Sequence, residues 1–90
     1  MLEKTLSERG ARYGSIADEA EISQALIAVM SETEGWKQLD DTMRHCLIMD
    51  AVKTARILNG DPTYPDNWHD KAGYATLVEK HVSPTRIERT

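Results

Sequence analysis

The sequence predicts an all-α protein, a small helical bundle of three main helices and one short N-terminal helix. Three segments repeat apolar residues at the spacing i, i+3, i+4, which puts them on one side of an α-helix. No run alternates apolar and polar residues over a convincing length, as a half-buried strand does. The pair Asn59-Gly60, which can form a hairpin turn, follows a helical pattern instead of a strand. We therefore expect one helical domain over residues 1–83 and a polar tail over residues 84–90.

The first two helices are predicted before Gly35. Residues 2–9 carry Leu2 and Leu6 four positions apart, which fits a helix of one or two turns. Ser15 has the side chain of an N-cap for the next helix, and acidic residues follow it in the first turn, where they favour the helix dipole. The apolar stripe that we expect to be buried on this helix consists of Ile22, Ala25, Leu26, Val29 and Met30.

The third helix is predicted to be the central one. It starts after Asp40 or Asp41 and ends at Asn59-Gly60, where the glycine predicts a left-handed stop. Residues 46–52 are apolar nearly all round the helix, apart from one aspartate, so this helix should pack against neighbours on more than one side.

The fourth helix follows a loop over residues 61–65. Asp66 or Asn67 is its predicted N-cap, and the polar tail begins after Pro84. Its apolar residues are expected mainly on one side of the helix, namely Trp68, Ala72, Ala75 and Val78, with Tyr74, Leu77 and His81 alongside.

Composition narrows the classes of partner. The chain has 90 residues with 11 Lys and Arg against 15 Asp and Glu, a net charge of −4, which argues against nucleic acid as a partner.

Cys46 is the only cysteine, so no internal disulfide can form, and we expect a reducing, cytoplasmic environment. No stretch approaches the ~18 apolar residues of a membrane span. So short a chain buries a modest core, which favours a homo-oligomer, either a dimer or a tetramer.

Asp50 is the most informative residue of the central helix, because it interrupts an apolar run. A buried carboxylate without a partner is strongly destabilising, so we expect it to have one. Lys53 and Arg56 follow it at one and two turns and share roughly its side of the helix. The three residues are expected to form a polar stripe, either as an internal ion pair or as a solvated surface.

A second group of acids opens the fourth helix. Asp66 and Asp70 are four residues apart, which puts both carboxylates on one side of the helix. Two carboxylates at this spacing can hold Mg²⁺ on a phosphate-bearing substrate, because Mg²⁺ prefers carboxylate, phosphate and water oxygens. The alternative is that Asp66 is an N-cap and Asp70 an acid that favours the helix dipole.

Arg12 and Tyr13 lie beside a turn at Gly14. The arginine can bind phosphate and the tyrosine can stack on a base, although such residues usually need no role of this kind. The sequence contains neither G-x-x-x-x-G-K-[ST] nor G-x-G-x-x-G, so Walker-type and Rossmann phosphate loops are excluded.

Three stretches between Arg9 and Ala75 carry a resemblance. They read R-G-A-R-Y-G at 9–14, K-T-A-R-I-L-N-G-D-P at 53–62 and D-N-W-H-D-K-A-G-Y-A at 66–75. In this combination the chain resembles a group of small phage- and prophage-encoded proteins of unassigned function. That group is in turn similar to the MazG-like all-α nucleoside triphosphate pyrophosphohydrolases, in which acidic pairs on two helices hold Mg²⁺ on the substrate phosphates while water attacks.

The resemblance implies a magnesium site, with manganese as the substitute, and a nucleotide substrate. The implied catalytic residues and metal ligands are Asp50, Asp66 and Asp70. The implied substrate-binding residues are Arg12, Tyr13, Lys53 and Arg56. The sequence departs from the family pattern, because Asp50-x-x-Lys53 stands where a first pair of acids is expected, and the second pair is spaced by four residues instead of three.

Three functions therefore stay open from the sequence. The first is a Mg²⁺-dependent nucleotide pyrophosphohydrolase. The second is a non-catalytic helical oligomerisation module that binds a nucleotide or a protein. The third is a purely structural oligomerisation module in which a buried ion pair of Asp50 with Lys53 or Arg56 sets how the helices associate. If the candidate acids and cations face one cleft, the first two are favoured.

Overall fold

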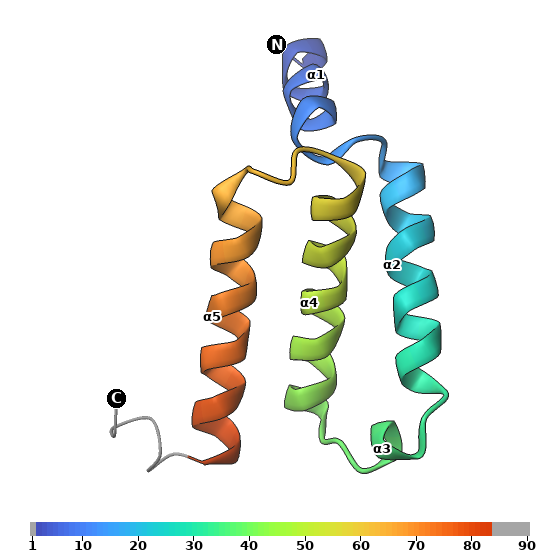
Figure 1. Cartoon of the computed structure of the whole chain (residues 1–90), viewed down its shortest axis with the longest axis vertical. Helices are drawn as coiled ribbons and strands as arrows, with labels where there is room; N and C mark the ends of the chain where they lie inside the picture. Colours follow the sequence, from blue (N-terminus) through green and yellow to red (C-terminus); the bar gives the residue numbers. More distant parts are fainter. Residues whose placement is uncertain (1, 84–90) are drawn as a thin grey trace.

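The computed structural model describes residues 2–83, and in this range the chain forms five helices and no strand. The helices are α1 (Leu2–Tyr13), α2 (Ile16–Ser31), α3 (Glu34–Lys37), α4 (Asp41–Asn59) and α5 (Pro65–Val82) (Figure 1). The predicted all-α fold is confirmed. No helix within the described range is long and apolar enough to cross a membrane. The predicted polar tail, residues 84–90, lies outside the described residues.

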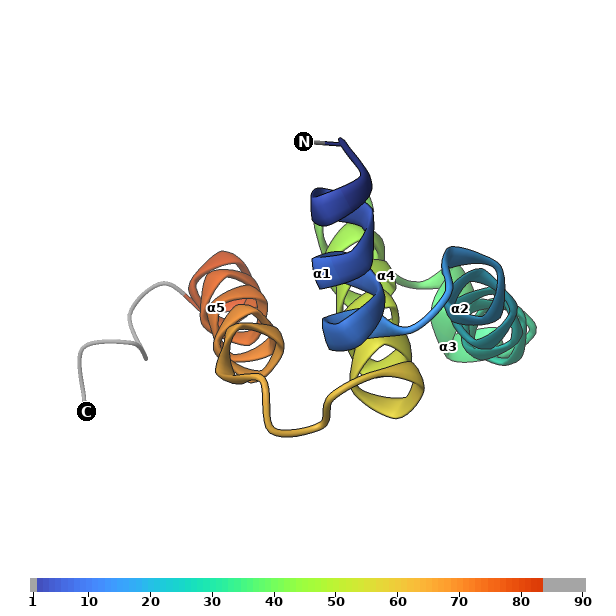
Figure 2. The same ribbon diagram turned by 90° about the horizontal axis from the view of Figure 1, so that it is seen from above.

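The three long helices form a single layer. Helix α4 lies between α2 and α5 and contacts both, and neighbouring helices run in opposite directions (Figure 1). Helix α1 lies beyond one end of this layer, over the C-terminal end of α4, and its N-terminus extends toward one side of the layer (Figure 1 and Figure 2). The radius of gyration is 15.3 Å, larger than the roughly 12 Å expected of a compact chain of this length. The fold is therefore flatter and more open than a closed bundle.

Side-chain caps set the beginnings of three helices. Ser15 Oγ accepts a hydrogen bond from the backbone N–H of Asp18 at 3.1 Å, and Asp40 Oδ1 accepts one from Met43 at 2.9 Å. The Ser15 cap is a confirmed prediction, and Asp40 is one of the two residues after which α4 was predicted to start. Each cap satisfies one of the free N–H groups of a first helical turn. Thr33 caps the four-residue α3 in the same way, and α3 was not predicted because it is too short for a periodic pattern.

Two predicted helix ends are wrong, and the end of α4 is right for a different reason. Helix α1 continues to Tyr13 instead of ending at Arg9. Helix α5 begins at Pro65, with Tyr64 in the N-cap position, because the fixed φ of proline suits the first helical residue. Gly60 ends α4 with φ −138°, outside the left-handed region, so it is not the predicted left-handed stop.

Close packing of two turns explains the glycine at position 60. The backbone N–H of Asp61 donates to the carbonyl oxygen of Arg12 at 2.8 Å, and Asn59 Nδ2 donates to the carbonyl oxygen of Tyr13 at 2.8 Å. A Cβ atom on Gly60 would collide with the backbone of Arg12. The turn after α1 and the turn after α4 are thus joined backbone to backbone.

We predict that Gly60→Ala destabilises the protein by about 2 kcal/mol, because the added methyl group must push these two turns apart. The matched control is Gly73→Ala in the interior of α5, where nothing lies within 4 Å of an added Cβ. That control should stabilise the helix by about 0.5–1 kcal/mol, since alanine favours helix more than glycine does. Urea unfolding of both variants measures the difference, and equal shifts would refute the close contact of the turns.

The core of the described chain is small and lies on α4. Its buried apolar residues are Cys46, Ala51, Ala55 and Ile57, which confirms α4 as the central helix. Large apolar side chains that remain exposed include Leu2, Leu6, Ile16, Val29, Leu47, Leu58, Trp68, Leu77 and Val82. The exposed apolar side chains thus outnumber and outsize the buried ones, which is unusual for a protein that acts as a monomer.

Candidate functional site

Two of the three predicted metal ligands are bound by side chains at the seam between α4 and α5. Asp50 Oδ1 accepts a hydrogen bond from Lys71 Nζ at 2.8 Å, and the same ammonium donates to Thr54 Oγ1 at 2.5 Å. Lys53 Nζ lies 2.9 Å from an oxygen of Asp70. Both pairs join α4 to α5. A lysine ammonium therefore lies beside each of these carboxylates, where the sequence predicts a metal cation.

The third predicted ligand, Asp66, lies in the first turn of α5. Its Oδ2 accepts a hydrogen bond from the hydroxyl of Tyr64 at 2.9 Å. Asp66 is thus neither the predicted N-cap nor part of a cluster, since among residues 2–83 no group of three or more His, Cys, Asp or Glu could hold one metal ion. The paired acids of one chain do not form the oxygen-rich site that Mg²⁺ prefers. A magnesium or manganese cofactor stays a prediction.

The predicted polar stripe of α4 has its partners on other helices. Asp50 pairs with α5 instead of with Lys53 or Arg56. Lys53, which is 9% exposed, pairs with α5 as well, and Arg56 Nε lies 3.4 Å from Glu19 on α2. The expectation of an ion pair within α4 is wrong, because successive turns of α4 meet different neighbours.

The pairing of Asp70 with Lys53 predicts a specific pH dependence. The hydrogen bond and positive charge of Lys53 hold the pKa of the Asp70 carboxyl below its ordinary value of 3.8. Between the lowered pKa and 3.8 the unfolded chain binds more protons, so this group's stabilisation is complete above about pH 4 and is lost as pH falls through the lowered pKa.

We therefore expect Asp70→Asn to be less stable than the unmodified chain at pH 7 and to approach it at about pH 2, as judged by urea unfolding. Asp66→Asn is the control, since Asp66 has a tyrosine hydroxyl in place of a cation as its neighbour. A stability difference for Asp70→Asn that stays constant over this pH range would contradict the assignment.

A buried carboxylate joins α1, α2 and α4. Glu19 is 5% exposed; Arg9 Nη2 lies 3.2 Å from one of its oxygens and Arg56 Nε lies 3.4 Å from the other. Both guanidinium groups also lie over the ring of Tyr13, at 5.2 and 4.8 Å from its centroid. The two cations and the aromatic ring compensate for the burial of the negative charge.

The predicted substrate-binding residues fall into two groups. Arg12, Tyr13 and Arg56 gather where α1 meets the layer, and the Arg12 guanidinium lies 5.0 Å from the ring centroid of Tyr64. Lys53 belongs to the seam between α4 and α5. All four therefore have contacts within the protein, and their binding of phosphate or base stays a prediction.

Sequence analysis missed the partners of these residues. The first-turn acids of α2, which include Glu19, were predicted only to favour the helix dipole, and no partner was predicted for Arg9 or Lys71. Asn59 was predicted only as part of the end of α4. Asn67, predicted as a possible N-cap, is instead buried inside α5: it is 1% exposed, and its Nδ2 has no hydrogen-bond partner within the described residues. The alternation of acids and lysines in both α4 and α5 is a signal that could have indicated ion pairs between the two helices.

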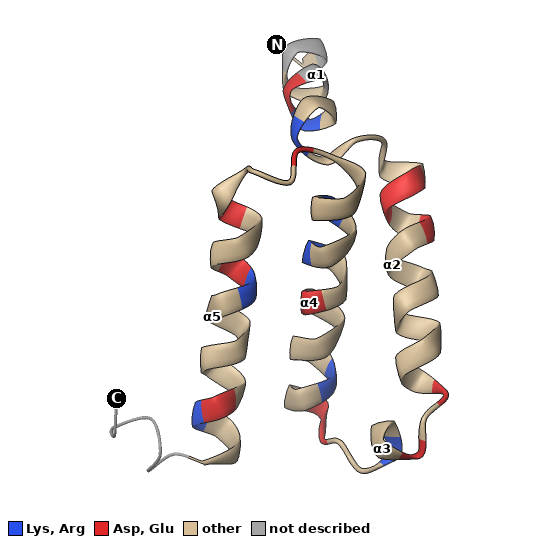
Figure 3. Cartoon of the chain, in the orientation of Figure 1, with Lys and Arg blue, Asp and Glu red and all other residues tan. Residues whose placement is uncertain are grey.

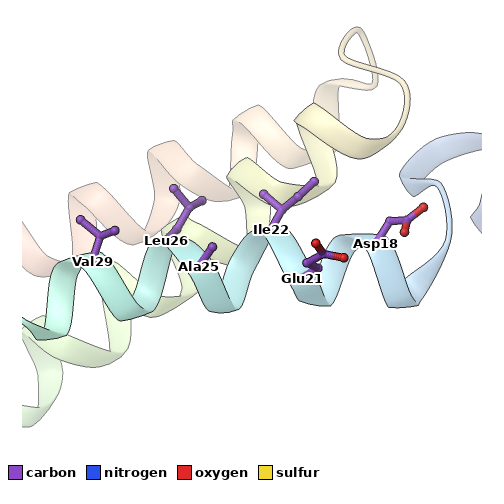
Figure 4. Close-up of a pocket in the computed structure, with 6 residues that line it drawn as sticks. All are labelled: Asp18, Glu21, Ile22, Ala25, Leu26 and Val29. Atoms are coloured by element: carbon purple, nitrogen blue, oxygen red, sulfur yellow. The ribbon is translucent and has the colours of Figure 1, made fainter.

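The most apolar side of α2 is only partly covered. Its buried residues are Glu19 and Ser23, so the helix turns a polar side toward α4. A shallow hollow on another side is lined by α2 residues alone, namely Asp18, Glu21, Ile22, Ala25, Leu26 and Val29 (Figure 4). The stripe that the sequence predicts to be buried is therefore only partly covered: Ile22, Leu26 and Met30 are half-buried, whereas Ala25 is exposed and Val29 is 67% exposed. The physical reason is that Glu19 occupies the side of α2 that faces α4, where its carboxylate binds Arg9 and Arg56.

A second apolar hollow, with a volume of 380 Å³, lies between α4 and α5. Its lining includes Met43, Leu47, Tyr74, Ala75 and Val78. The Asp50 carboxylate lies at its edge, already paired with Lys71. The hollow is therefore mostly apolar and offers no unpaired charge of its own.

Helical geometry places these apolar residues on one side of the layer. The contacts of Glu19, Asp50 and Lys71 fix how α2, α4 and α5 are rotated, and each further residue turns by about 100°. On this basis one side carries the residues that we call the open face: Ile22, Ala25, Leu26, Val29, Leu47, Leu58, Trp68 and Val82. The opposite side carries Arg56, Lys53 and Asp70, together with α1 (Figure 2).

The open face includes a long uncharged stretch. Between Glu21 and Glu32, α2 has no Lys, Arg, Asp or Glu (Figure 3). The charged groups that join the helices lie at the seams and on the α1 side.

Compared with known proteins, the chain gives no significant match to a family model, a curated protein or a solved structure.

Proposed function

We propose that this chain is a non-catalytic helical module that binds another protein chain through its open face. The observation that carries the proposal is the stripe of α2 that the chain covers only in part: Ala25 and Val29 are exposed, and Ile22 and Leu26 are half-buried and line an open hollow. Burying apolar area contributes about 25 cal/mol per Å², so covering this stripe and its neighbours on α4 and α5 supplies a strong driving force for association. A contiguous apolar surface of this kind is typical of a protein interface.

The predicted acids support a structural role in the same proposal. Asp50 and Asp70 hold α4 and α5 together through lysines, and Glu19 holds α1 and α2 to α4. These ion pairs fix the helices relative to one another, although few apolar side chains are buried between them. The charged residues thus position the helices, and the apolar residues of the open face form the binding surface.

Site-specific photo-cross-linking tests the proposal. A benzophenone amino acid at position 29 on the open face is compared with the same group at position 20, an exposed alanine on the other side of α2. In cells that naturally express the chain, we expect position 29 to form one discrete adduct with a protein that mass spectrometry identifies, and position 20 to form none. Absence of adducts at position 29, or equal adducts at both positions, would overturn the proposal.

Nucleotide pyrophosphohydrolase activity is the competing function, and release of phosphate and pyrophosphate tests it. We expect no release above a protein-free control from a panel of nucleoside and deoxynucleoside triphosphates with Mg²⁺ or Mn²⁺, because Asp50 and Asp70 are paired with lysines and Asp66 lies apart from them, bound to the Tyr64 hydroxyl. Thermal unfolding with and without the metals should show no shift, since only a ligand bound by the native state raises stability. Turnover that Asp70→Asn abolishes would establish the enzyme and contradict the non-catalytic proposal.

A further inference from the structure

We infer that the protein chain bound at the open face is a second copy of this chain, with the two α2 helices antiparallel across a twofold axis. This inference rests on the proposed function, because it names the partner of the same surface. A twofold arrangement uses one surface twice, so the open face must be complementary to itself.

The shortage of core in a single chain identifies the partner. The buried apolar residues of the described chain are two alanines, one cysteine and one isoleucine. So small a core requires that the open face be covered by apolar groups in every folded chain. A second copy of the same chain is the partner that is present wherever the chain is made. Obligate dimers behave in this way, because the folded protomer is stable only with its partner.

The size of the layer is sufficient for such a dimer. Its longest helix, α4, has 19 residues and is therefore about 28 Å long. With the 32 Å second extent of the chain, this length bounds about 900 Å², close to the roughly 800 Å² that each partner contributes to a standard interface. The open face occupies one side of this layer, so a second copy that covers it fully would bury enough area for a stable dimer.

The position of the charges favours the antiparallel arrangement. Asp18 and Glu21 lie at the N-terminal end of the α2 hollow, and the other lining residues are apolar. A parallel pair of α2 helices would bring four carboxylates together, and like charges repel at this distance. In an antiparallel pair, Asp18 of one chain lies near Val29 of the other and about 19 Å from the second Asp18, since the two aspartates are offset by about 11 residues along the axis and lie on helices about 9 Å apart. Ala25, near the middle of the stripe, has a small side chain that permits close helix packing.

Disulfide trapping between two purified variants tests this arrangement. Chains carrying Asp18→Cys are mixed in equal amounts with chains carrying Val29→Cys, both in a Cys46→Ala background, and oxidised mildly. Because a disulfide needs Cα atoms within about 7 Å, we expect the mixed 18–29 product in about tenfold excess over 18–18 and 29–29 products. Light scattering should give twice the chain mass of 10.1 kDa. Ala20→Cys is the control and should not cross-link.

The outcomes separate this inference from the proposed function. A monomeric mass, together with a cellular adduct of position 29 to a different protein, would overturn the second copy as partner and leave the proposed function standing. A dimer that yields 18–18 and 29–29 products would overturn the antiparallel arrangement. Cross-linking through position 20 in place of position 29 would overturn both, since the interface would then lie on the other side of α2.

Discussion

Ala25→Glu is expected to dissociate the protein into single chains. In the antiparallel dimer the two new carboxylates lie close to each other near the middle of an apolar interface, where each is desolvated without a cation. We expect the dissociation constant to rise at least about 100-fold, which corresponds to about 2.7 kcal/mol. Size-exclusion chromatography with light scattering, over a dilution series, measures the change in mass.

Ala20→Glu is the matched control for this prediction. Both alanines are exposed on α2, and both changes carry the same small cost in helix propensity. Ala20 lies on the other side of the helix, so a carboxylate there remains in water. If both variants dissociate equally, or if neither does, the open face is not the interface.

Glu19→Ala is expected to cause the largest loss of folding stability among changes outside the open face, about 3 kcal/mol. The substitution leaves Arg9 and Arg56 close together without the carboxylate that both contact, and it removes the link between α1, α2 and α4. Urea unfolding measures the loss. The large effect comes from the burial of Glu19, because exposed ion pairs contribute little.

Glu21→Ala provides the comparison, since Glu21 is exposed on the same helix two residues later. A surface change of this kind is expected to alter stability by less than about 0.5 kcal/mol. Similar losses for Glu19→Ala and Glu21→Ala would show that the buried carboxylate does not stabilise the junction of the three helices.

The helices could be predicted because their signals are local. Ser15 and Asp40 are caps with side chains that reach the first turn, and the spacing of apolar residues in α2 and α4 is helical. The predicted end of α4 at Asn59 was also correct, although the reason given for it was not. Here Gly60 is required by contact with a distant turn, which no local pattern records.

The candidate site could not be predicted in the same way, because ion pairs depend on how helices pack. Spacing along α4 places Asp50, Lys53 and Arg56 on roughly one side, yet their partners are Lys71, Asp70 and Glu19 on two other helices. The apolar stripe of α2 was recognised, but its partner could not be read from one chain. Residue spacing indicates that a helix has an apolar side and does not say which molecule covers it.

The dependence of unfolding on protein concentration tests the central claim most directly, because it asks whether folding needs a second copy. Urea midpoints of the unmodified chain are measured over a 100-fold range of concentration. If the open face joins two copies, the midpoint rises with concentration, since association stabilises only the folded state. A midpoint that is the same at every concentration would contradict the account, because a chain that folds alone does not need its open face covered by another copy.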